Sequence, residues 1–375
     1  MSALSTRPDI AVLGGGLAGR LCAWRLARQG YEVALYERGG PDGTQAAAWV
    51  AAAMLAPLGE AAVAEPLIVD MGAAGLLCWP ELLAALPRPV FFQRNGTLVV
   101  WHTPDRAEAI MFERRLRANA PPALLDGGVQ PLSQATLGDV EPTLAQRFAE
   151  GLLLPNEGQL DNRQLLAALG EGLLAEGVRL HWHQAIDDAA PPEAGLILDC
   201  RGLGARAAWR GLRGVRGEVV RLHAPGIGLR RPVRLLHPRY PIYIAPKQDD
   251  VYVIGATELE SDDMSPVSVR SALELLSAAF SLHPAFGEGR ILELNSQCRP
   301  TLPDHLPSVC WNGARTIRVN GLYRHGYLLA PAVTGEACAL VEAVLAQRAA
   351  PVAQGHFKQW CEQRAWPALF HLEEH

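Results

Sequence analysis

At the start of the chain, continuous apolar runs typical of buried strands alternate with apolar residues at helical spacing. A short apolar run at 9–13 leads into a glycine-rich turn. Apolar residues then recur at helical spacing over 17–30, before a second apolar run at 31–37. Gly30 follows the last periodic position, where glycine commonly ends a helix. The pattern predicts a buried strand, a glycine turn, a helix and a second strand.

The middle of the chain predicts strands of a different kind. Alternation over 90–103, on either side of Asn95 and Gly96, predicts a two-stranded hairpin, because Asn-Gly is a preferred tight-turn pair. A helix is expected to begin at Asp161, whose side chain can cap the amide groups of the first turn. Residues 217–257 are predicted to form consecutive antiparallel strands.

Strand and helix patterns like those at the start of the chain return after these antiparallel strands. This order predicts two interleaved domains rather than two consecutive ones. Residues 314–323 predict a strand, and residues 334–348 predict an amphipathic helix. The predicted fold class is α/β, α+β overall, with a Rossmann-like domain interleaved with an antiparallel-sheet domain. The predicted boundaries assign residues 1–80, 151–210 and 300–375 to the first domain and residues 81–150 and 211–299 to the second.

Composition indicates a globular protein and argues against some function classes. Of 375 residues, 49% are hydrophobic and 19% are charged, which is enough apolar material for two packed cores. The net charge of −5, with Lys and Arg scattered along the chain, argues against nucleic-acid binding. Seven cysteines without a CxxC pair indicate a reducing cytoplasm rather than a disulfide framework. Proline or charge interrupts every apolar stretch before about 18 residues, so no membrane-spanning segment is predicted.

The glycine turn has the spacing of a dinucleotide-binding loop. Gly14, Gly16 and Gly19 match GxGxxG between the first strand and the helix, and the second strand ends in Glu37. Glycine at these positions permits a tight turn, close approach of a pyrophosphate and close helix packing, and the acid can bind a ribose diol. The spacing leaves FAD and NAD open. A run of small residues at 44–57 would let the chain pass close to a flat cofactor, and an Ala-rich buried helix explains it equally well.

Seven motifs in order resemble the D-amino-acid-oxidase-like FAD-dependent oxidoreductases, and among them the thiamine-pathway glycine oxidases most. They are GGGLAG with Glu37, AAAMLAP, EGQLDNRQLLAAL, GVRGEVV, YIAPKQDDVYVIGATE, CRPTLPDHLP and GLYRHGYLLAPAVTGE. The resemblance covers nearly the whole chain and implies FAD as the cofactor. Related sarcosine oxidases attach FAD through a cysteine, but Cys298 is one residue away from that position, so non-covalent FAD is predicted.

The resemblance also implies which residues contact FAD. They are Gly14, Gly16, Leu17, Ala18, Gly19, Glu37, Arg38, Ala47, Ala48, Ala52, Ala53, Met54, Val178, Leu322, Tyr323, Arg324, His325, Gly326, Tyr327 and Leu328. Ala52 and Ala53 stand where the family usually has two glycines, which leaves the flavin geometry open. Lys247 replaces an arginine that is common in its motif.

Three residues are implied at the substrate. Arg299 lies in the Arg-Pro-x-x-Pro-Asp pattern whose arginine binds the substrate carboxylate, and its planar guanidinium suits a bidentate contact. An ordinary ion pair with a nearby acid is the alternative. Tyr243 matches the phenol that binds the same carboxylate, although a half-buried strand tyrosine would show the same pattern. Arg324 matches an arginine near the ring. His181 and His183 lack a third ligand, so no metal site is predicted.

The activity that the resemblance implies is oxidative deamination of glycine or another small primary or secondary amino acid. Its products would be an oxo acid, ammonia and, from O2, hydrogen peroxide, with a role in thiamine (thiazole) biosynthesis. The expected partners are the amino acid and O2, and a homo-oligomer is compatible with the sequence. Two alternatives remain: a D-amino-acid dehydrogenase that passes electrons to a quinone or protein, and a flavoprotein that modifies a macromolecule.

Overall fold

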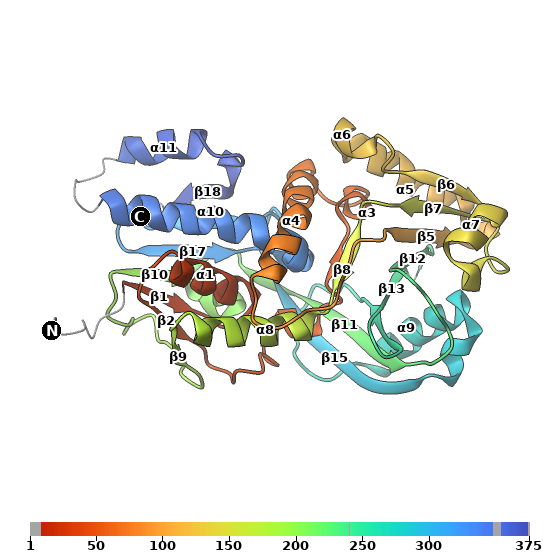
Figure 1. Ribbon diagram of the computed structural model, residues 1–375, viewed down its shortest axis with the longest axis horizontal. Coiled ribbons are helices and arrows are strands. Elements are labelled where there is room, and N and C mark those ends of the chain that lie inside the picture. The colour runs from red at the N-terminus through yellow and green to blue at the C-terminus, as the bar shows by residue number, and fades with distance from the viewer. Residues whose placement is uncertain (1–8, 240, 348–353, 374–375) are drawn as a thin grey trace.

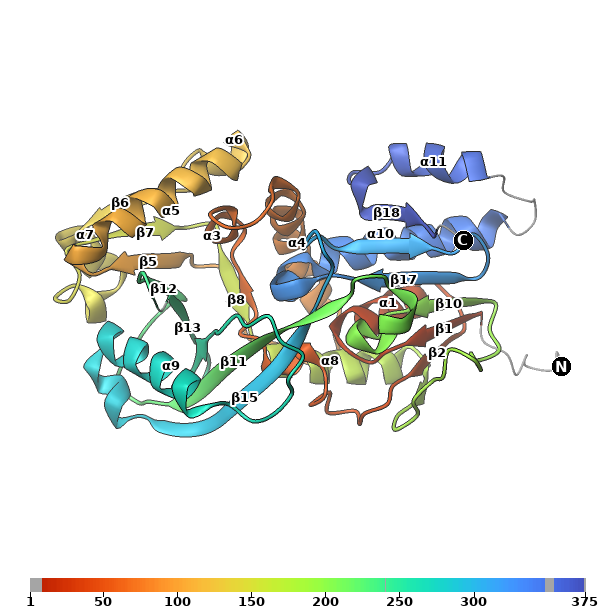
Figure 2. The same ribbon diagram turned by 180° about the vertical axis from the view of Figure 1, so that it is seen from behind.

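Two large β-sheets lie at opposite ends of an elongated molecule, as the computed structural model shows (Figures 1 and 2). The structure describes residues 9–239, 241–347 and 354–373. The chain passes between the sheets several times, so each sheet is built from segments that are far apart in the sequence. The mixed α/β fold class is confirmed.

The first sheet contains the predicted strand, turn, helix and strand. Its order is β18 (Phe370–Leu372), β16 (Ser308–Trp311), β17 (Thr316–Asn320), β10 (Leu196–Asp199), β1 (Ile10–Leu13), β2 (Val33–Tyr36), β9 (Arg179–His181). Neighbouring strands are parallel except β16 and β17. The central strands β1 and β10 are buried along their whole length, as apolar runs covered on both faces require.

Helices cover this sheet and contribute to its large core. They are α1 (Leu17–Arg28), α4 (Pro66–Ala84), α8 (Asn162–Ala175), α10 (Gly326–Gln347) and α11 (Gln354–Glu362). Helix α1 packs against both α8 and α10, and α4 packs against α10. Asp161 caps α8 as predicted, because its Oδ1 accepts hydrogen bonds from the amides of Arg163 (2.9 Å) and Gln164 (2.8 Å).

The second sheet has eight strands and is antiparallel except for one pair. Its order is β15 (Arg290–Thr301), β11 (Arg213–His223), β14 (Val251–Gly255), β13 (Ile242–Pro246), β12 (Val233–Leu236), β5 (Thr97–Trp101), β7 (Glu150–Leu154), β6 (Gln130–Ser133). Only β12 and β5 run parallel among these neighbours. The predicted antiparallel strands of 217–257 are confirmed, and β11 and β15 are the longest strands of the described chain.

Smaller elements fill the space around and between the two sheets. A three-stranded sheet has the order β3 (Met54–Leu55), β8 (Gly158–Leu160), β4 (Phe92–Gln93). The remaining helices are α2 (Ala47–Val50), α3 (Pro57–Ala61), α5 (Arg106–Asn119), α6 (Pro122–Leu125), α7 (Gln134–Val140) and α9 (Val269–Leu282). The interleaved two-domain division stays a proposal; β7 belongs to the eight-stranded sheet, although residue 151 was expected to begin a segment of the other domain.

The hairpin predicted around Asn95 and Gly96 is wrong. Strand β4 pairs with β8, whereas β5 pairs with β7 and β12, so the two segments belong to different sheets. Contacts with distant residues hold the bend, since the guanidinium of Arg231 donates to the carbonyl of Asn95 at 2.5 Å. Gly96 has φ +90°, which glycine adopts without strain. The Asn-Gly pair therefore marks a turn between sheets rather than within one.

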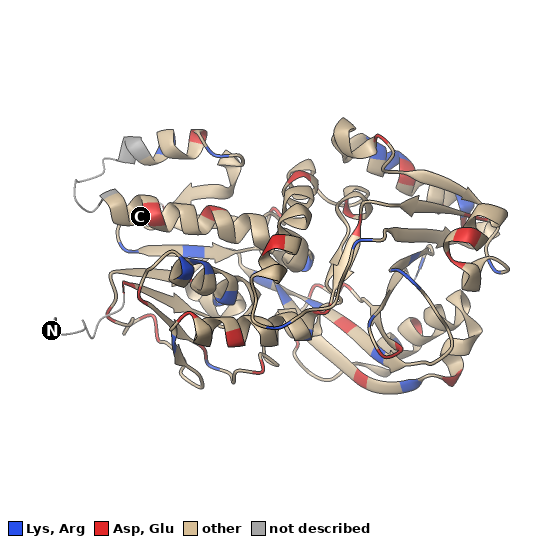
Figure 3. Ribbon diagram, viewed as in Figure 1, with Lys and Arg blue, Asp and Glu red and all other residues tan. Residues whose placement is uncertain are grey.

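Charge and apolarity on the fold bear on two of the expectations about partners. Acidic and basic residues are spread over both ends of the molecule (Figure 3). Two helical segments, Pro66–Ala84 and Tyr323–Ala346, are long and apolar enough to cross a membrane by length and composition alone. Core helices pass the same test, and 72% of the most apolar window of the second is buried inside the protein. These segments are weak support for a membrane span.

Candidate functional site

The glycine turn has the geometry of a nucleotide cradle. Gly14 has φ +97°, and a Cβ atom on Gly19 would lie 1.8 Å from the carbonyl oxygen of Gly14, so only glycine fits there. A Cβ on Gly16 would meet nothing nearer than Ala46 at 3.7 Å, which leaves that side of the turn open. The amide groups at the N-terminus of α1 begin here, and they favour an anionic group.

Two charged residues, Glu37 and Arg20, hold the glycine turn in place through hydrogen bonds to its backbone. The carboxylate of Glu37 accepts hydrogen bonds from the amides of Gly15 (2.5 Å) and Gly39 (2.7 Å). Arg20 is fully buried and donates to the carbonyls of Gly15 (2.6 Å), Pro41 and Leu166 (both 2.8 Å). The sequence analysis missed Arg20, because an arginine on the buried face of a helix has no motif of its own.

A cavity of about 1220 Å³ extends from the glycine turn to the eight-stranded sheet. Eighteen of the predicted cofactor residues line it, namely Gly14, Gly16, Leu17, Ala18, Glu37, Arg38, Ala47, Ala48, Ala52, Ala53, Met54, Leu322, Tyr323, Arg324, His325, Gly326, Tyr327 and Leu328. Gly19 lies behind the turn. Val178 lies apart from the cavity, buried in the core beside β9, and its amide donates to the carbonyl of Leu173 (3.0 Å). The long cavity and the open glycine turn fit FAD.

The small residues at 51–56 form an extended wall of the cavity rather than a long helix. Ala53 has φ +54°, a left-handed conformation that costs an alanine about 1–2 kcal/mol. The ammonium group of Lys247 donates to the carbonyls of Ala52 and Leu160 (both 2.8 Å) and to Oε1 of Gln159 (3.0 Å). Burial lowers the pKa of Lys247 to about 7. Lys247 therefore fixes this wall from the side of the eight-stranded sheet.

Ala53→Gly is expected to stabilise the protein by about 0.5–1 kcal/mol. Glycine removes the left-handed strain, and its greater freedom in the unfolded chain offsets part of that gain. Thermal unfolding should shift upward by about 1–3 °C for a chain of this size. Ala52→Gly is the matched control: Ala52 does not have a positive φ, so glycine there should lower stability. Equal shifts for the two variants would contradict the strain at Ala53.

A cluster of charged residues lines the cavity beside the segment 322–328, which leads into α10. Glu60 accepts hydrogen bonds from Arg234 and, at 2.9 Å, from Arg324, and it lies 3.3 Å from Nδ1 of His325. Burial alone would raise the pKa of Glu60, but Arg324, Arg234 and His325 beside it hold that pKa well below its usual range. Burial lowers the pKa of His325 to about 4, so its imidazole is neutral at pH 7.

Arg324 is bound to two carboxylates. Besides Glu60, it contacts Oε2 of Glu258 at 3.0 Å, and Oε1 of Glu258 accepts a hydrogen bond from the phenol of Tyr323 at 2.6 Å. Glu258 follows β14 in the eight-stranded sheet, whereas Tyr323 and Arg324 precede α10. The contacts of Glu258 with Tyr323 and Arg324 therefore join the two halves of the cavity wall. The sequence analysis missed Glu60 and Glu258, which are distant in sequence from their partners.

Glu157 lies behind this cluster and is completely buried. Its Oε1 accepts a hydrogen bond from the amide of Gly59 at 2.6 Å, and its Oε2 makes no hydrogen bond to the described residues. Burial raises the pKa of Glu157 to about 7, although Arg234 nearby lowers it in part. A carboxyl whose pKa is raised on folding contributes stability that is fully present below its unfolded pKa of about 4.5 and is lost as the pH rises through about 7.

Glu157→Gln is therefore expected to gain stability relative to the wild type as the pH rises from 5 to 8. The amide keeps an acceptor for the amide of Gly59 and never becomes charged. Denaturant unfolding of both proteins at pH 5 and pH 8 measures the effect, which we expect to reach about 1–2 kcal/mol. Glu150→Gln, at a surface ion pair with Arg106, should show no such difference. An unchanged difference between wild type and Glu157→Gln at the two pH values would refute the raised pKa.

Arg299 and Tyr243 line the same cavity from strands β15 and β13 of the eight-stranded sheet, which are separated by β11 and β14. The guanidinium of Arg299 donates only to backbone carbonyls, those of Arg216 (3.4 Å) and Thr257 (3.2 Å), and it makes no ion pair with the acidic residues that the structure describes. Tyr243 lies beside Gly255, where a Cβ atom would approach its hydroxyl to 2.6 Å. Burial raises the pKa of Tyr243, although Arg299 nearby lowers it in part, so the phenol stays protonated. The alternative of an ordinary ion pair at Arg299 finds no support.

Cys298 is among the residues that line the cavity, but its thiol is held in a buried position. It is buried, with 2% of its surface exposed, and its Sγ lies 3.5 Å from the carbonyl oxygens of Ser261 and Asp263. Burial raises the pKa of the thiol, which disfavours the thiolate needed for covalent attachment. All seven cysteines are free, and non-covalent binding of FAD stays a prediction.

Known proteins are similar to this chain in sequence and in fold over most of its length. Residues 9–340 match the family described as FAD dependent oxidoreductase. A protein of Rhizobium etli named as a thiamine biosynthesis oxidoreductase, ThiO, is 43% identical over 327 residues, covering 87% of this chain and 94% of the relative. Glycine oxidase from Geobacillus kaustophilus is 27% identical over 352 residues, covering 88% of this chain and 91% of the relative. Its crystal structure superposes with a TM-score of 0.77 at 26% identity, covering 90% of this chain and 95% of that one. The chain therefore belongs to the family of FAD-dependent oxidoreductases.

Proposed function

We propose that this enzyme oxidises glycine or another small primary or secondary amino acid to the oxo acid and ammonia, with O2 reduced to hydrogen peroxide. The observation that carries the proposal is the guanidinium of Arg299, which lines the cavity without an acidic partner among the described residues. The likeness to ThiO of Rhizobium etli and to a glycine oxidase supports the substrate class and a role in thiamine biosynthesis. A homo-oligomer in the cytoplasm is part of the same proposal.

Carboxylate recognition is assigned to Arg299 and Tyr243. Two of the five N–H groups of the guanidinium point at carbonyls, which leaves others for two parallel charge-assisted bonds to a substrate carboxylate. The protonated phenol of Tyr243 can donate a further hydrogen bond to the same group. Arg324 has a different proposed role, because Glu60 and Glu258 already bind its guanidinium. Arg324 fixes the segment 322–328 beside the cavity.

The cofactor site is assigned to the glycine turn, Glu37, the 52–54 wall and the segment 322–328. When bound there, FAD supplies the acceptor for the hydride that the amino acid loses. The protein's own contribution is to position the amino acid by its carboxylate, which turns the reaction into an intramolecular one. The amine must enter neutral, and water then hydrolyses the imine product. Burial lowers the pKa of His325 to about 4, so its imidazole is a weak base, and Glu60 is ion-paired; neither is therefore assigned as a general base.

Substrate-dependent peroxide production tests this function. The FAD-loaded protein is mixed in air with glycine, sarcosine and D-alanine, and hydrogen peroxide and oxygen uptake are measured. The same panel is repeated without oxygen, where bleaching of the yellow flavin reports reduction directly. Turnover only with an artificial dye would replace O2 by a quinone or protein acceptor. A flavin that no small amino acid bleaches would overturn the proposal and favour a macromolecular substrate.

A further inference from the structure

The GVRGEVV motif at 214–220 has no role in the site described so far. It forms the middle of β11, and Arg216 and Glu218 point to the same face of that strand because they are two residues apart. Both side chains are buried, with 4% and 1% of their surfaces exposed. Nε and Nη2 of Arg216 both donate to Oε1 of Glu218, at 3.0 and 2.7 Å. Burying such a pair is costly, so its presence alone is weak support for a stabilising role.

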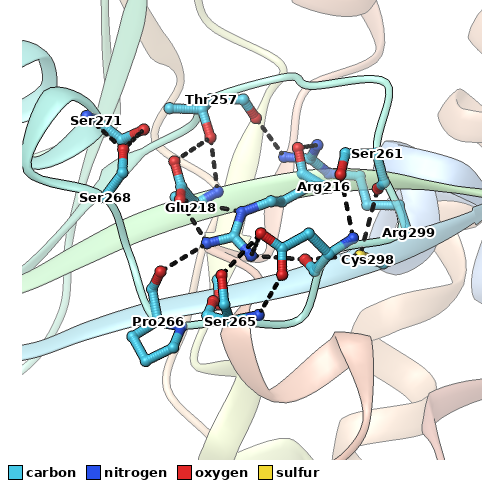
Figure 4. A network of polar contacts seen from close by, with 12 residues as sticks. Arg216, Glu218, Thr257, Ser261, Ser265, Pro266, Ser268, Ser271, Cys298 and Arg299 are labelled. Carbon is cyan, nitrogen blue, oxygen red and sulfur yellow. Dashed lines mark hydrogen bonds and ion pairs between the residues drawn. The ribbon is translucent and has the colours of Figure 1, made fainter.

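Most of the remaining hydrogen bonds of these two side chains are made with the segment 257–266. Nη1 of Arg216 donates to the carbonyl of Asp263 at 2.6 Å, and Nη2 donates to that of Pro266 at 3.0 Å (Figure 4). Oε2 of Glu218 accepts a hydrogen bond from the hydroxyl of Thr257 at 3.1 Å, and the same hydroxyl accepts from the amide of Glu218 at 3.0 Å. The buried pair thus fixes both ends of the segment 257–266 against β11.

Arg299 is hydrogen-bonded to backbone carbonyls of the same network. Its two hydrogen-bond acceptors are the carbonyl of Arg216, a member of the buried pair, and the carbonyl of Thr257, whose hydroxyl donates to Glu218 (Figure 4). Gly217, between Arg216 and Glu218, leaves the space for the guanidinium, since a Cβ atom there would lie 2.2 Å from Nη2 of Arg299. Without defined carbonyl positions, a long arginine side chain would sample several rotamers.

We propose that Arg216, Glu218 and Thr257 are positioning residues that orient the Arg299 guanidinium for the substrate carboxylate. This inference rests on the proposed role of Arg299. The carboxylate of Glu218 is central, because it binds Arg216 on one side and the Thr257 hydroxyl on the other. Burial alone would raise the pKa of Glu218, but hydrogen bonds from Ser271, Arg216 and Thr257 lower it, so the carboxylate is charged at neutral pH.

The test is a double-mutant cycle on the FAD-loaded protein, with acetate as a bare carboxylate probe and the visible flavin spectrum as the readout. Glu218→Gln should raise the Kd for acetate about tenfold, which corresponds to about 1.4 kcal/mol. In the Arg299→Lys background, the same change should alter Kd by less than twofold. For the amino acid substrate, Glu218→Gln should raise KM while kcat stays within about twofold. A purely structural role would not produce this split.

A second pair of variants keeps the test independent of folding at Glu218. Thr257→Val keeps the shape of the side chain and removes the hydroxyl, and it should raise the acetate Kd severalfold, whereas Thr257→Ser should restore it. Glu293→Gln is the matched control, because Glu293 lies on the same strand as Arg299 but pairs with Arg163 away from the cavity. That variant should leave Kd unchanged.

Two outcomes would overturn the inference, and a third would overturn the proposed function instead. The positioning role is wrong if Glu218→Gln and Thr257→Val leave the acetate Kd within twofold of the wild type. It is also wrong if Glu218→Gln raises Kd equally in the wild-type and Arg299→Lys backgrounds, since the two sites would then act independently. If Arg299→Lys itself leaves acetate binding unchanged, the role of Arg299 in the proposed function fails.

Discussion

Arg299→Ala should raise KM for the amino acid roughly 100-fold or more while FAD stays bound. Each charge-assisted hydrogen bond contributes about 1.5–3 kcal/mol, and alanine removes two of them together with the positive charge. Because Arg299 lines the cavity from β15 and not from the glycine turn, flavin content should not change. Steady-state kinetics on protein with measured flavin content gives the result.

A control on the same strand separates this effect from damage to β15. Arg290 is exposed at the start of the strand and donates only to the carbonyl of Glu288 in the described structure, so Arg290→Ala should leave KM unchanged. If Arg299→Ala kept a wild-type KM, the carboxylate would bind elsewhere. Loss of flavin from Arg299→Ala would instead show that the variant disturbs the cofactor site.

Gly19→Ala should weaken FAD binding by roughly 10- to 100-fold, because overpacking at a close contact costs about 1–3 kcal/mol. The new methyl group would lie 1.8 Å from the carbonyl oxygen of Gly14, so helix α1 must move away from the glycine turn. Fluorescence titration of the apoprotein with FAD measures the loss. Amino acid turnover at saturating FAD should recover in part, since Arg299 and Tyr243 are untouched.

Gly138→Ala is a suitable control for this change. It also adds one methyl group to a helical glycine, in α7, where the nearest atom is the Cβ of Ala145 at 3.3 Å. FAD affinity should therefore stay at the wild-type value. An equal loss in the two variants, or none in Gly19→Ala, would mean that close packing of α1 on the turn does not govern cofactor binding.

The features of the fold that could be predicted from the sequence are those that a local pattern of residues determines. The glycine turn with its flanking strands, the cap at Asp161 and the antiparallel strands up to Gly255 all depend on residues that are close in the chain, and the structure confirms them. The Asn95 turn failed because its partners, such as Arg231, are distant in sequence. Tertiary contacts overrode the local preference there.

The candidate site also contains residues that a local motif predicts and residues that only distant contacts reveal. The role proposed for Arg299 could be predicted only through its motif, since spacing alone does not distinguish a substrate arginine from a surface one. Arg20 and the pair of Glu60 with Arg324 could not be identified, because their meaning depends on contacts across 146 and 264 residues of chain. The composition of the 44–57 segment allowed a helix, and the strained backbone at Ala53 is visible only in the fold.

The order of strands in the seven-stranded sheet constrains how the chain can be synthesised and folded. Strand β1 lies between β2 and β10, and β10, the central strand, pairs next with β17. A ribosome releases Ile10–Leu13 long before Leu196–Asp199 and Thr316–Asn320. The nascent N-terminal segment must therefore wait with an unpaired apolar edge, a situation that invites aggregation and slows folding. Because residues 322–328 also line the cavity, we expect FAD to bind only after almost all of the polypeptide has emerged.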